Sequence, residues 1–203
     1  MATGNCPTLS SFLVGDQCEE NFAGMGMVVY AFERNQVNTA LLKKSSSDDS
    51  IYEVQKSNNA GIQTFLNANH YAVKFECKRE SQQVQGESQG ERKGFIITAN
   101  FVIEAVDENT AKIARALNMK DLAYILVENG SKKPQILYDK VQRCQIESGG
   151  LTTDTGLAAT DDRQMSVSIK LGPVSHPNFF LDTTNLTKGL DGLLQQTSSS
   201  SSS

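Results

Sequence analysis

The sequence predicts a mainly β protein of the α+β class, an antiparallel β-sandwich or barrel with one flanking helix. Three stretches alternate apolar and polar side chains: Tyr71 to Lys78, Phe95 to Val106 and Gln164 to Leu171. A period of two is typical of strands with one buried and one solvated face. At 203 residues and 38% hydrophobic content, the chain is long enough for one domain with a core.

The first strand is expected where Gly24-Met25-Gly26 leads into the apolar run Met27 to Phe32, which suits burial on both faces. Lys43 to Ser50 is polar and small, so it is expected to be a solvent loop. In the Tyr71 strand, the core face is predicted to carry Tyr71, Val73, Phe75 and Cys77, and the solvent face Ala72, Lys74, Glu76 and Lys78. Ser81 to Lys93 has little to pack and predicts an exposed loop or an extended hairpin tip.

Phe95 to Val106 is a strand long enough to be the spine of a sheet. Thr110 to Met119 places Ile113, Ala114 and Leu117 at helical spacing, which predicts the single flanking helix. Leu122 to Val127 reads as a buried strand, Asn129-Gly130 as a turn, and Gln135 to Tyr138 as the return strand of a hairpin.

Val141 to Glu147 predicts another strand, and Ser148 to Asp162, with its glycines and acidic residues, predicts a loop. Gln164 to Leu171 is the last clean strand, and Gly172-Pro173 is expected to end it. The predicted organisation is an N-terminal arm (1–24), a β domain (25–172), a C-terminal arm (173–197) and a serine tail (198–203). The apolar pieces of the C-terminal arm, Phe179 to Leu181 and Leu186 to Leu194, either pack on their own core or reach a neighbouring copy.

The composition argues against several functions. A net charge of −4 and a pI near 5.2 disfavour a surface that grips nucleic acid. No apolar run approaches the ~20 residues of a membrane span, and the first 21 residues lack the pattern of a secretory signal. We therefore expect a soluble protein made in the cytoplasm, with no membrane partner.

Catalytic motifs are also missing. The sequence has no P-loop, no G-x-S-x-G elbow and no H-E-x-x-H, and its two histidines, His70 and His176, are far from the four scattered cysteines. We therefore expect no enzyme activity, no cofactor and no metal, and we interpret Cys77 as a reduced core thiol. A metal-assisted hydrolase using the Asp154, Asp161 and Asp162 loop is the weakest alternative.

The order of these elements resembles that of phage tail tube proteins, in particular those of phages infecting Bacteroidetes-type hosts. The resemblance covers residues 18 to 172. It rests on Cys18 through Gly24-Met25-Gly26 into Val28-Val29-Tyr30, on Arg92-Lys93-Gly94, on Thr110 to Leu117 followed by Tyr124 to Gly130, and on Ser148-Gly149 to Asp162.

The resemblance implies a structural virion protein of the phage tail, assembled in the host cytoplasm. Hexameric rings would share strands in one continuous inner barrel and stack into a tube. The partners would be copies of the chain and other tail proteins, and the genome would pass through the lumen without specific binding. Closing a sheet between subunits also removes exposed strand edges, which invite aggregation in a lone chain.

Two sets of site residues follow as expectations. The polar rows of the alternating strands are the candidate lumen lining: Lys74, Glu76, Gln164, Ser166 and Ser168. Loops and arms too long for a compact monomer are the candidate contacts between subunits and rings: Phe12, Phe22, Ser45, Asp48, Gln83, Glu87, Arg92, Phe179, Phe180 and Leu190. The alternative from another class is a β-sandwich virion or binding module that decorates a capsid or binds carbohydrate.

Overall fold

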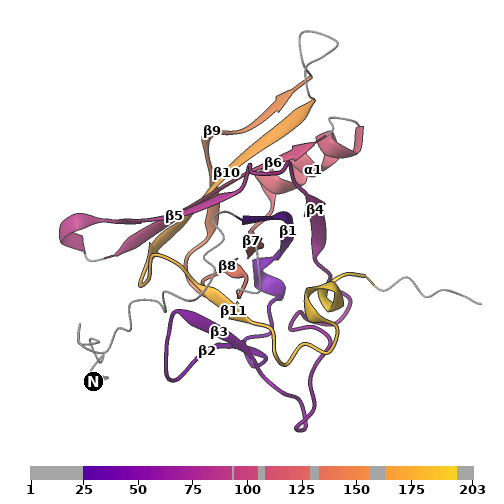
Figure 1. Ribbon diagram of the computed structural model, residues 1–203, viewed down its shortest axis with the longest axis vertical. Coiled ribbons are helices and arrows are strands. Elements are labelled where there is room, and N and C mark those ends of the chain that lie inside the picture. Colours follow the sequence, from indigo (N-terminus) through magenta and orange to yellow (C-terminus); the bar gives the residue numbers. More distant parts are fainter. Residues whose placement is uncertain (1–24, 93, 105–107, 129–132, 156–162, 196–203) are drawn as a thin grey trace, which may run out of the picture.

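The computed structural model describes residues 25–92, 94–104, 108–128, 133–155 and 163–195, and within them it forms two β-sheets and one α-helix (Figure 1). The predicted fold class, mainly β with a flanking helix, is confirmed. The strands are β1 Met25–Glu33, β2 Leu42–Lys44, β3 Ile51–Val54, β4 Val73–Glu76, β5 Gln83–Ser88, β6 Phe95–Glu104, β7 Leu122–Glu128, β8 Gln135–Leu137, β9 Cys144–Asp154, β10 Gln164–Val174 and β11 Phe180–Asp182. The helices are α1 Glu108–Met119 and the short 3₁₀ turns η2 Arg34–Gln36, η3 Gly90–Arg92 and η4 Gly189–Leu193.

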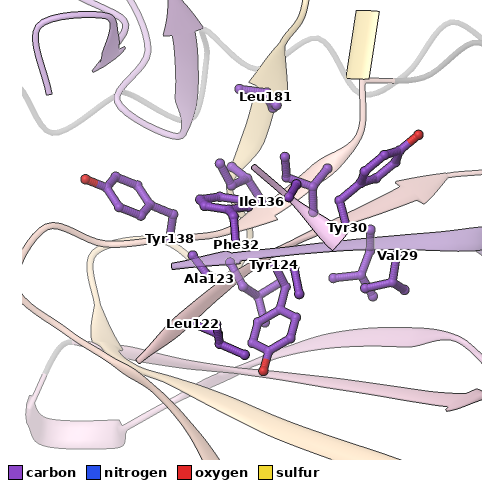
Figure 2. Close-up of a cluster of buried hydrophobic side chains, with 14 of the residues drawn as sticks. Val29, Tyr30, Phe32, Leu122, Ala123, Tyr124, Ile136, Tyr138 and Leu181 are labelled. Atoms are coloured by element: carbon purple, nitrogen blue, oxygen red, sulfur yellow. The ribbon is translucent and has the colours of Figure 1, made fainter. Parts of the chain in front are cut away.

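The larger sheet has seven strands in the order β2-β3-β11-β8-β7-β1-β4. Its centre is buried on both faces, as the apolar runs of β1 and β7 predicted: Val29 is fully buried and Phe32 is 2% exposed. The ring centroid of Tyr124 lies 6.3 Å from that of Phe101 in the smaller sheet. The ring centroid of Phe32 lies 5.7 Å from that of Phe65, in the connection after β3. Figure 2 shows Tyr124 and Phe32 on opposite sides of the sheet. The sheet is therefore the middle layer of the molecule.

The smaller sheet has four strands in the order β5-β6-β10-β9. One face of β6 and β10 is apolar and almost completely buried: Ile97, Ala99, Phe101, Met165, Val167, Ile169 and Leu171. The alternation predicted for these two strands is confirmed. The segment Ser81 to Lys93 contains β5, which pairs with β6 from Gln83 to Ser88, so the hairpin alternative is the correct one.

Two strands continue where the sequence predicted an end. β10 runs through Gly172-Pro173, a cis peptide, to Val174, because a register shift after Leu171 accommodates the proline. β9 runs through Ser148 to Asp154, so the loop predicted from Ser148 is wrong up to that point. Gly149 has a φ of +75° beside a register shift, so it forms a bulge rather than a turn. Residues 156–162 lie outside the described residues.

The strand predicted from Tyr71 to Lys78 is shorter and starts differently. Tyr71 and Val73 are 45% and 53% exposed, whereas Ala72 is 6% exposed. The prediction for these three residues is wrong. Ala72 is covered because its backbone N–H donates to the O of Leu193, the last residue of η4, at 2.8 Å. Phe75 and Cys77 are buried as predicted, and burial raises the pKa of the Cys77 thiol to about 11.

The hairpin regions agree with the sequence only in part. Helix α1 and strand β7 occur as predicted, while the turn at 129–130 lies outside the described residues. The predicted solvent loop Lys43 to Ser50 begins inside β2, which pairs with β3. No helix in the described ranges is long and apolar enough to span a bilayer.

The C-terminal segment packs on the chain's own core. β11 lies between β3 and β8 in the seven-stranded sheet, and Phe179 and Leu193 are 1% and 0% exposed. Of the two alternatives left open by the sequence, packing on the core is therefore correct for residues 173–195. This segment is part of the domain and not a separate arm.

Candidate assembly interface

The outer face of the four-stranded sheet is polar across its strands. Residues directly opposite one another in an antiparallel ladder share a face. The register therefore places Gln83 beside Asn100 and Ser168, and Gln85 beside Thr98 and Lys170. We call this surface the polar face and define it by Gln83, Gln85, Glu87, Thr98, Asn100, Val102, Gln164, Ser166, Ser168 and Lys170.

An ion pair stands on the polar face. Lys170 Nζ contacts Glu147 Oε1 of β9, and Ser168 Oγ donates to Glu147 Oε2 at 3.3 Å. The ammonium of Lys170 lowers the pKa of the Glu147 carboxyl, so both groups are ionised at neutral pH. Glu87 of β5 lies on the same face, as do Glu104 and Asp154, which stand opposite Gln164 on either side, so the face has more carboxylates than ammonium groups and cannot grip a phosphate backbone.

The two ends of this sheet are strand edges. β5 and β9 each pair on one side only, β5 with β6 and β9 with β10. All of β5 except Val84 is exposed, and most of β9 is exposed or half-buried. An edge strand presents unpaired N–H and C=O groups and is a template for pairing with another chain.

The outer edge of β4, at one end of the seven-stranded sheet, is partly occupied. Ala72 N donates to the O of Leu193 at the end of η4, and Lys78 N donates to Val102 O of β6 at 2.7 Å. A bridge between Cys77 and Ile103 joins the two sheets at the same place. At the other end, β2 has three residues. The longest open edges among the described strands are therefore those of β5 and β9.

The structure separates the predicted lumen residues into two groups. Gln164, Ser166 and Ser168 lie together on the polar face. Lys74 and Glu76 lie on β4 in the other sheet, where Lys74 Nζ is 3.8 Å from Asp191 Oδ1 of η4. Tyr30 OH also donates to Asp191 Oδ1, at 3.0 Å. Lys74 thus has an ion-pair partner in its own chain.

The predicted contact residues are divided in the same way. Gln83 and Glu87 are exposed on β5 and belong to the polar face, and Asp48 is exposed in the turn after β2. Two assignments are wrong: Ser45 is 7% exposed, bonded to Ser47 Oγ, and Phe179 is buried against Tyr52. Both are inaccessible to a neighbouring subunit.

The remaining contact residues are only partly described. Phe180 and Leu190 are half-buried, and Leu190 packs against the core. Arg92 ends η3, and its side chain lies outside the described part of the chain. Phe12 and Phe22 also lie outside it. These five residues stay predictions.

Sequence reasoning missed Glu147 and Lys170. Glu147 was assigned to a strand ending before a loop, and the Gly149-Gly150 pair looked like part of that loop. The actual signal was that polar residues Thr152 and Thr153 continue beyond the glycines, which is typical of a bulged edge strand. Gly86 was missed as well: a Cβ there would stand 2.3 Å from Pro177 O, so the connection between β10 and β11 lies directly against β5.

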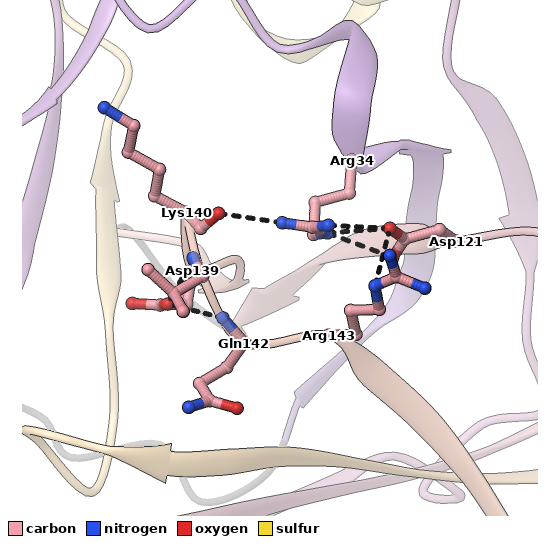
Figure 3. A network of polar contacts seen from close by, with 7 residues as sticks. Arg34, Asp121, Asp139, Lys140, Gln142 and Arg143 are labelled. Atoms are coloured by element: carbon pink, nitrogen blue, oxygen red, sulfur yellow. Dashed lines mark hydrogen bonds and ion pairs between the residues drawn. The ribbon is translucent and has the colours of Figure 1, made fainter.

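A second polar cluster joins η2, the connection between α1 and β7, and the connection between β8 and β9 (Figure 3). Arg34 donates from Nε and Nη2 to Asp121 at 2.8 to 3.0 Å and from Nη1 to Lys140 O at 2.9 Å. Arg143 Nε is 3.4 Å from the same carboxylate. A cavity of about 440 Å³ borders the cluster. Because Arg34 joins three connecting segments through Nε, Nη1 and Nη2, the cluster holds the fold together.

Comparisons with protein-family models, curated proteins and solved structures found no match. Among the described residues, no three His, Cys, Asp or Glu side chains are grouped as metal ligands.

Proposed function

We propose that this chain is a structural subunit that assembles with copies of itself through the four-stranded sheet, and that the assembly is the tail tube of a phage. The observation that carries the proposal is a sheet with two open edges, β5 and β9, and a polar outer face. The buried inner face anchors this sheet to the rest of the molecule.

Two different edges favour a ring. If β9 of one copy pairs with β5 of the next, the contact is heterologous, and a heterologous contact closes into a ring when its rotation permits. Six subunits, the number implied by the resemblance, would contribute four strands each to a barrel of 24. With ~4.8 Å between strands and a tilt of ~40°, such a barrel is about 50 Å across its backbone.

The polar face would line the lumen of that barrel. Gln164, Ser166 and Ser168 would then face the passing genome, as the sequence predicted. A wall of hydroxyls, amides and carboxylates on a chain of net charge −4 offers DNA no adhesion. Lys74 and Glu76, on the other sheet, would lie outside this lining. The function would be passage and rigidity, with no bond broken.

Edge-to-edge pairing can be tested by cysteine cross-linking. In a background carrying Cys6→Ser and Cys18→Ser, Thr152→Cys on β9 is combined in turn with Gln83→Cys, Gln85→Cys or Glu87→Cys on β5. Opposite residues on one face come within disulfide distance, so at least one combination should produce a covalent ladder of oligomers on a non-reducing gel. Each single variant is the matched control, because a heterologous contact brings together unlike positions.

Electron microscopy of concentrated wild-type protein is the complementary test. Rings and tubes are expected by negative staining. Small particles at every concentration, together with the absence of a ladder from all three combinations, would contradict self-assembly and favour the capsid-decorating or carbohydrate-binding module. Deleting β5 would be a poor test, because its loss would uncover the ladder side of β6.

A further inference from the structure

The cavity of about 440 Å³ beside the Arg34–Asp121 pair has an apolar base and a polar rim. The base includes Leu117, Tyr124 and Ile169, which are at most 4% exposed. The rim includes the exposed residues Asn118, Arg143 and Gln145. We call it the α1–β9 cavity. A cavity of this size with a few polar groups is typical of sites for small molecules.

The hydroxyl of Tyr124 is the polar group at the base of this cavity. The side chain is 2% exposed, and Figure 2 shows its hydroxyl pointing away from the seven-stranded sheet. Burial raises the pKa of the phenol, so it is neutral near pH 7 and can both donate and accept. No group in the described ranges forms a hydrogen bond with it, although buried hydroxyls normally have a partner. A neutral hydroxyl without a partner at the base of a cavity indicates a place for a polar atom of a ligand.

Arg143 supplies hydrogen-bond donors at the rim. Its Nε is 3.4 Å from the Asp121 carboxylate, and its Nη1 and Nη2 have no partner in the part of the chain that the structure describes. Asp121 is already held by Arg34, so two guanidinium groups share one carboxylate and one positive charge is left over. Lys120 also lines the cavity, but its ammonium is paired with Glu33. The available charge is therefore that of Arg143, whose planar fork matches a carboxylate.

The rest of the base offers no polar side chain. Leu117 and Ile169 are buried, and Ile146 of β9 lines the cavity as a half-buried residue. Aliphatic side chains of this kind are stabilised by contact with an apolar body that displaces water from them. The wall thus combines a cationic fork at the rim, an apolar surface, and one hydroxyl at the base.

We propose that the α1–β9 cavity binds a small monocarboxylate whose apolar body carries a hydroxyl at its far end. The carboxylate accepts hydrogen bonds from Arg143, the apolar body packs on Leu117 and Ile169, and the hydroxyl pairs with that of Tyr124. All these residues belong to one chain. The site can therefore be tested on dilute protein, whether or not assembly through β5 and β9 occurs.

The first test is calorimetric titration of dilute full-length protein with hydroxyaryl carboxylates of increasing length. The probes are 4-hydroxybenzoate, 4-hydroxyphenylacetate and 3-(4-hydroxyphenyl)propionate, and at least one should bind saturably. Two analogues of the best probe are the controls. The analogue without the ring hydroxyl should bind about fivefold more weakly, and the analogue with an alcohol in place of the carboxylate about tenfold more weakly. No saturable binding by any probe, or equal binding of the acid and its alcohol, would overturn the proposal.

Two variants assign the contacts. Tyr124→Phe removes a hydroxyl that has no partner, so it should fold as the wild type does and lose only the preference for the hydroxyl on the probe. Arg143→Met should lose only the preference for the acid over the alcohol. Arg79→Met is the matched control and should keep both preferences, because Arg79 is 82% exposed and outside the cavity lining. A Tyr124→Phe or Arg143→Met variant that kept both preferences would contradict the proposed contacts.

Nuclear magnetic resonance locates the bound probe. Nuclear Overhauser contacts are expected between the ring protons of the probe and the methyl groups of Ile146 and Ile169, which line the cavity. Ile62 is the control, since it lies outside the lining and should show no contact. Contacts confined to methyl groups outside the lining would show that the probe binds elsewhere and would overturn the proposal.

Discussion

Arg34 shows how one side chain can hold several connections in place. It follows β1 directly, and its guanidinium reaches Asp121 just before β7 and the carbonyl of Lys140 before β9. The bidentate pair is only partly solvated, with side-chain exposures of 15% for Arg34 and 23% for Asp121. Such a pair resists disruption because either partner, left alone, keeps a charge in a half-buried place.

We expect Arg34→Ala to lower the free energy of unfolding by about 2 to 3 kcal/mol, because it leaves the Asp121 carboxylate without its bidentate donor. Arg143→Ala is the control, since Arg143 contacts the same carboxylate from a side chain that is 67% exposed. Its expected effect is within about 0.5 kcal/mol. Urea denaturation measures both, and equal losses would contradict the assigned role of Arg34.

Asp182 predicts a pH dependence. Lys133 Nζ donates to Asp182 Oδ2 at 2.8 Å, and with Thr184 it lowers the pKa of the carboxyl to about 2. An unfolded aspartate titrates near 3.9, so the stabilisation is complete above about pH 4 and is lost as the pH falls toward 2. Asp182→Asn should therefore reduce the change in unfolding free energy across this pH window. The expected reduction is several tenths of a kcal/mol, after allowance for solvent screening.

Titration of stability by urea denaturation between pH 2 and 5 measures this effect. Glu91→Gln, a change at an exposed position in η3, is the control and should leave the profile as in the wild type. An Asp182→Asn profile as steep as that of the wild type would show that the carboxyl contributes nothing in the acid range.

At the scale of elements, β9 depends on two glycines. Gly149 adopts a φ of +75°, which side chains other than glycine rarely tolerate, and Gly150 lies against β10 so closely that a Cβ would stand 2.8 Å from Ser168 O. The bulge lets the strand pass the register shift and still pair with β10 on both sides of it. It also places Glu147 beside Lys170.

Gly150→Ala should destabilise the protein by about 1 to 3 kcal/mol, because the added methyl group must displace the backbone of β10. Ser148→Ala, at an exposed position two residues earlier in the same strand, is the matched control and should have little effect. Thermal unfolding compares them. If both variants melted alike, the close contact at Gly150 would be of no energetic importance.

For the whole molecule, the arrangement of layers determines which polar residues share a surface. The buried seven-stranded sheet lies between the four-stranded sheet and a layer of connections that includes Phe65. The polar face is consequently one continuous surface with an open strand at either side. A surface of this kind suits the proposed wall of a channel better than a ligand pocket, because its polar side chains do not converge on one site.

The proposed lumen predicts that added charge changes DNA binding in a position-dependent way. Ser166→Lys with Ser168→Lys should make assembled protein retain duplex DNA, with a strong salt dependence. Ser46→Lys with Ser47→Lys adds the same charge at exposed positions of the β2–β3 turn and should retain far less. Fluorescence anisotropy of a labelled duplex measures both. Equal retention would argue against a lumen at β10.

The success of the sequence predictions varied with the kind of signal. β6, β10 and α1 were predictable because their apolar spacing is regular over many residues. Tyr71 and Val73 were assigned to the core because the alternation was right, but alternation cannot report whether a neighbouring layer extends far enough to cover a strand. Phe179 was assigned to an interface because its segment looked like an arm, and its partners Tyr52 and Lys44 are distant in sequence.

Local periodicity alone therefore determined that this protein is a β-sandwich with one helix, since the alternation of side chains depends only on strand geometry. Tertiary structure decided which strands end a sheet, where a glycine pair becomes a bulge and which polar rows share a face. Those properties depend on pairings between residues that can be more than a hundred positions apart, and such pairings follow from the packing of whole layers rather than from any local pattern.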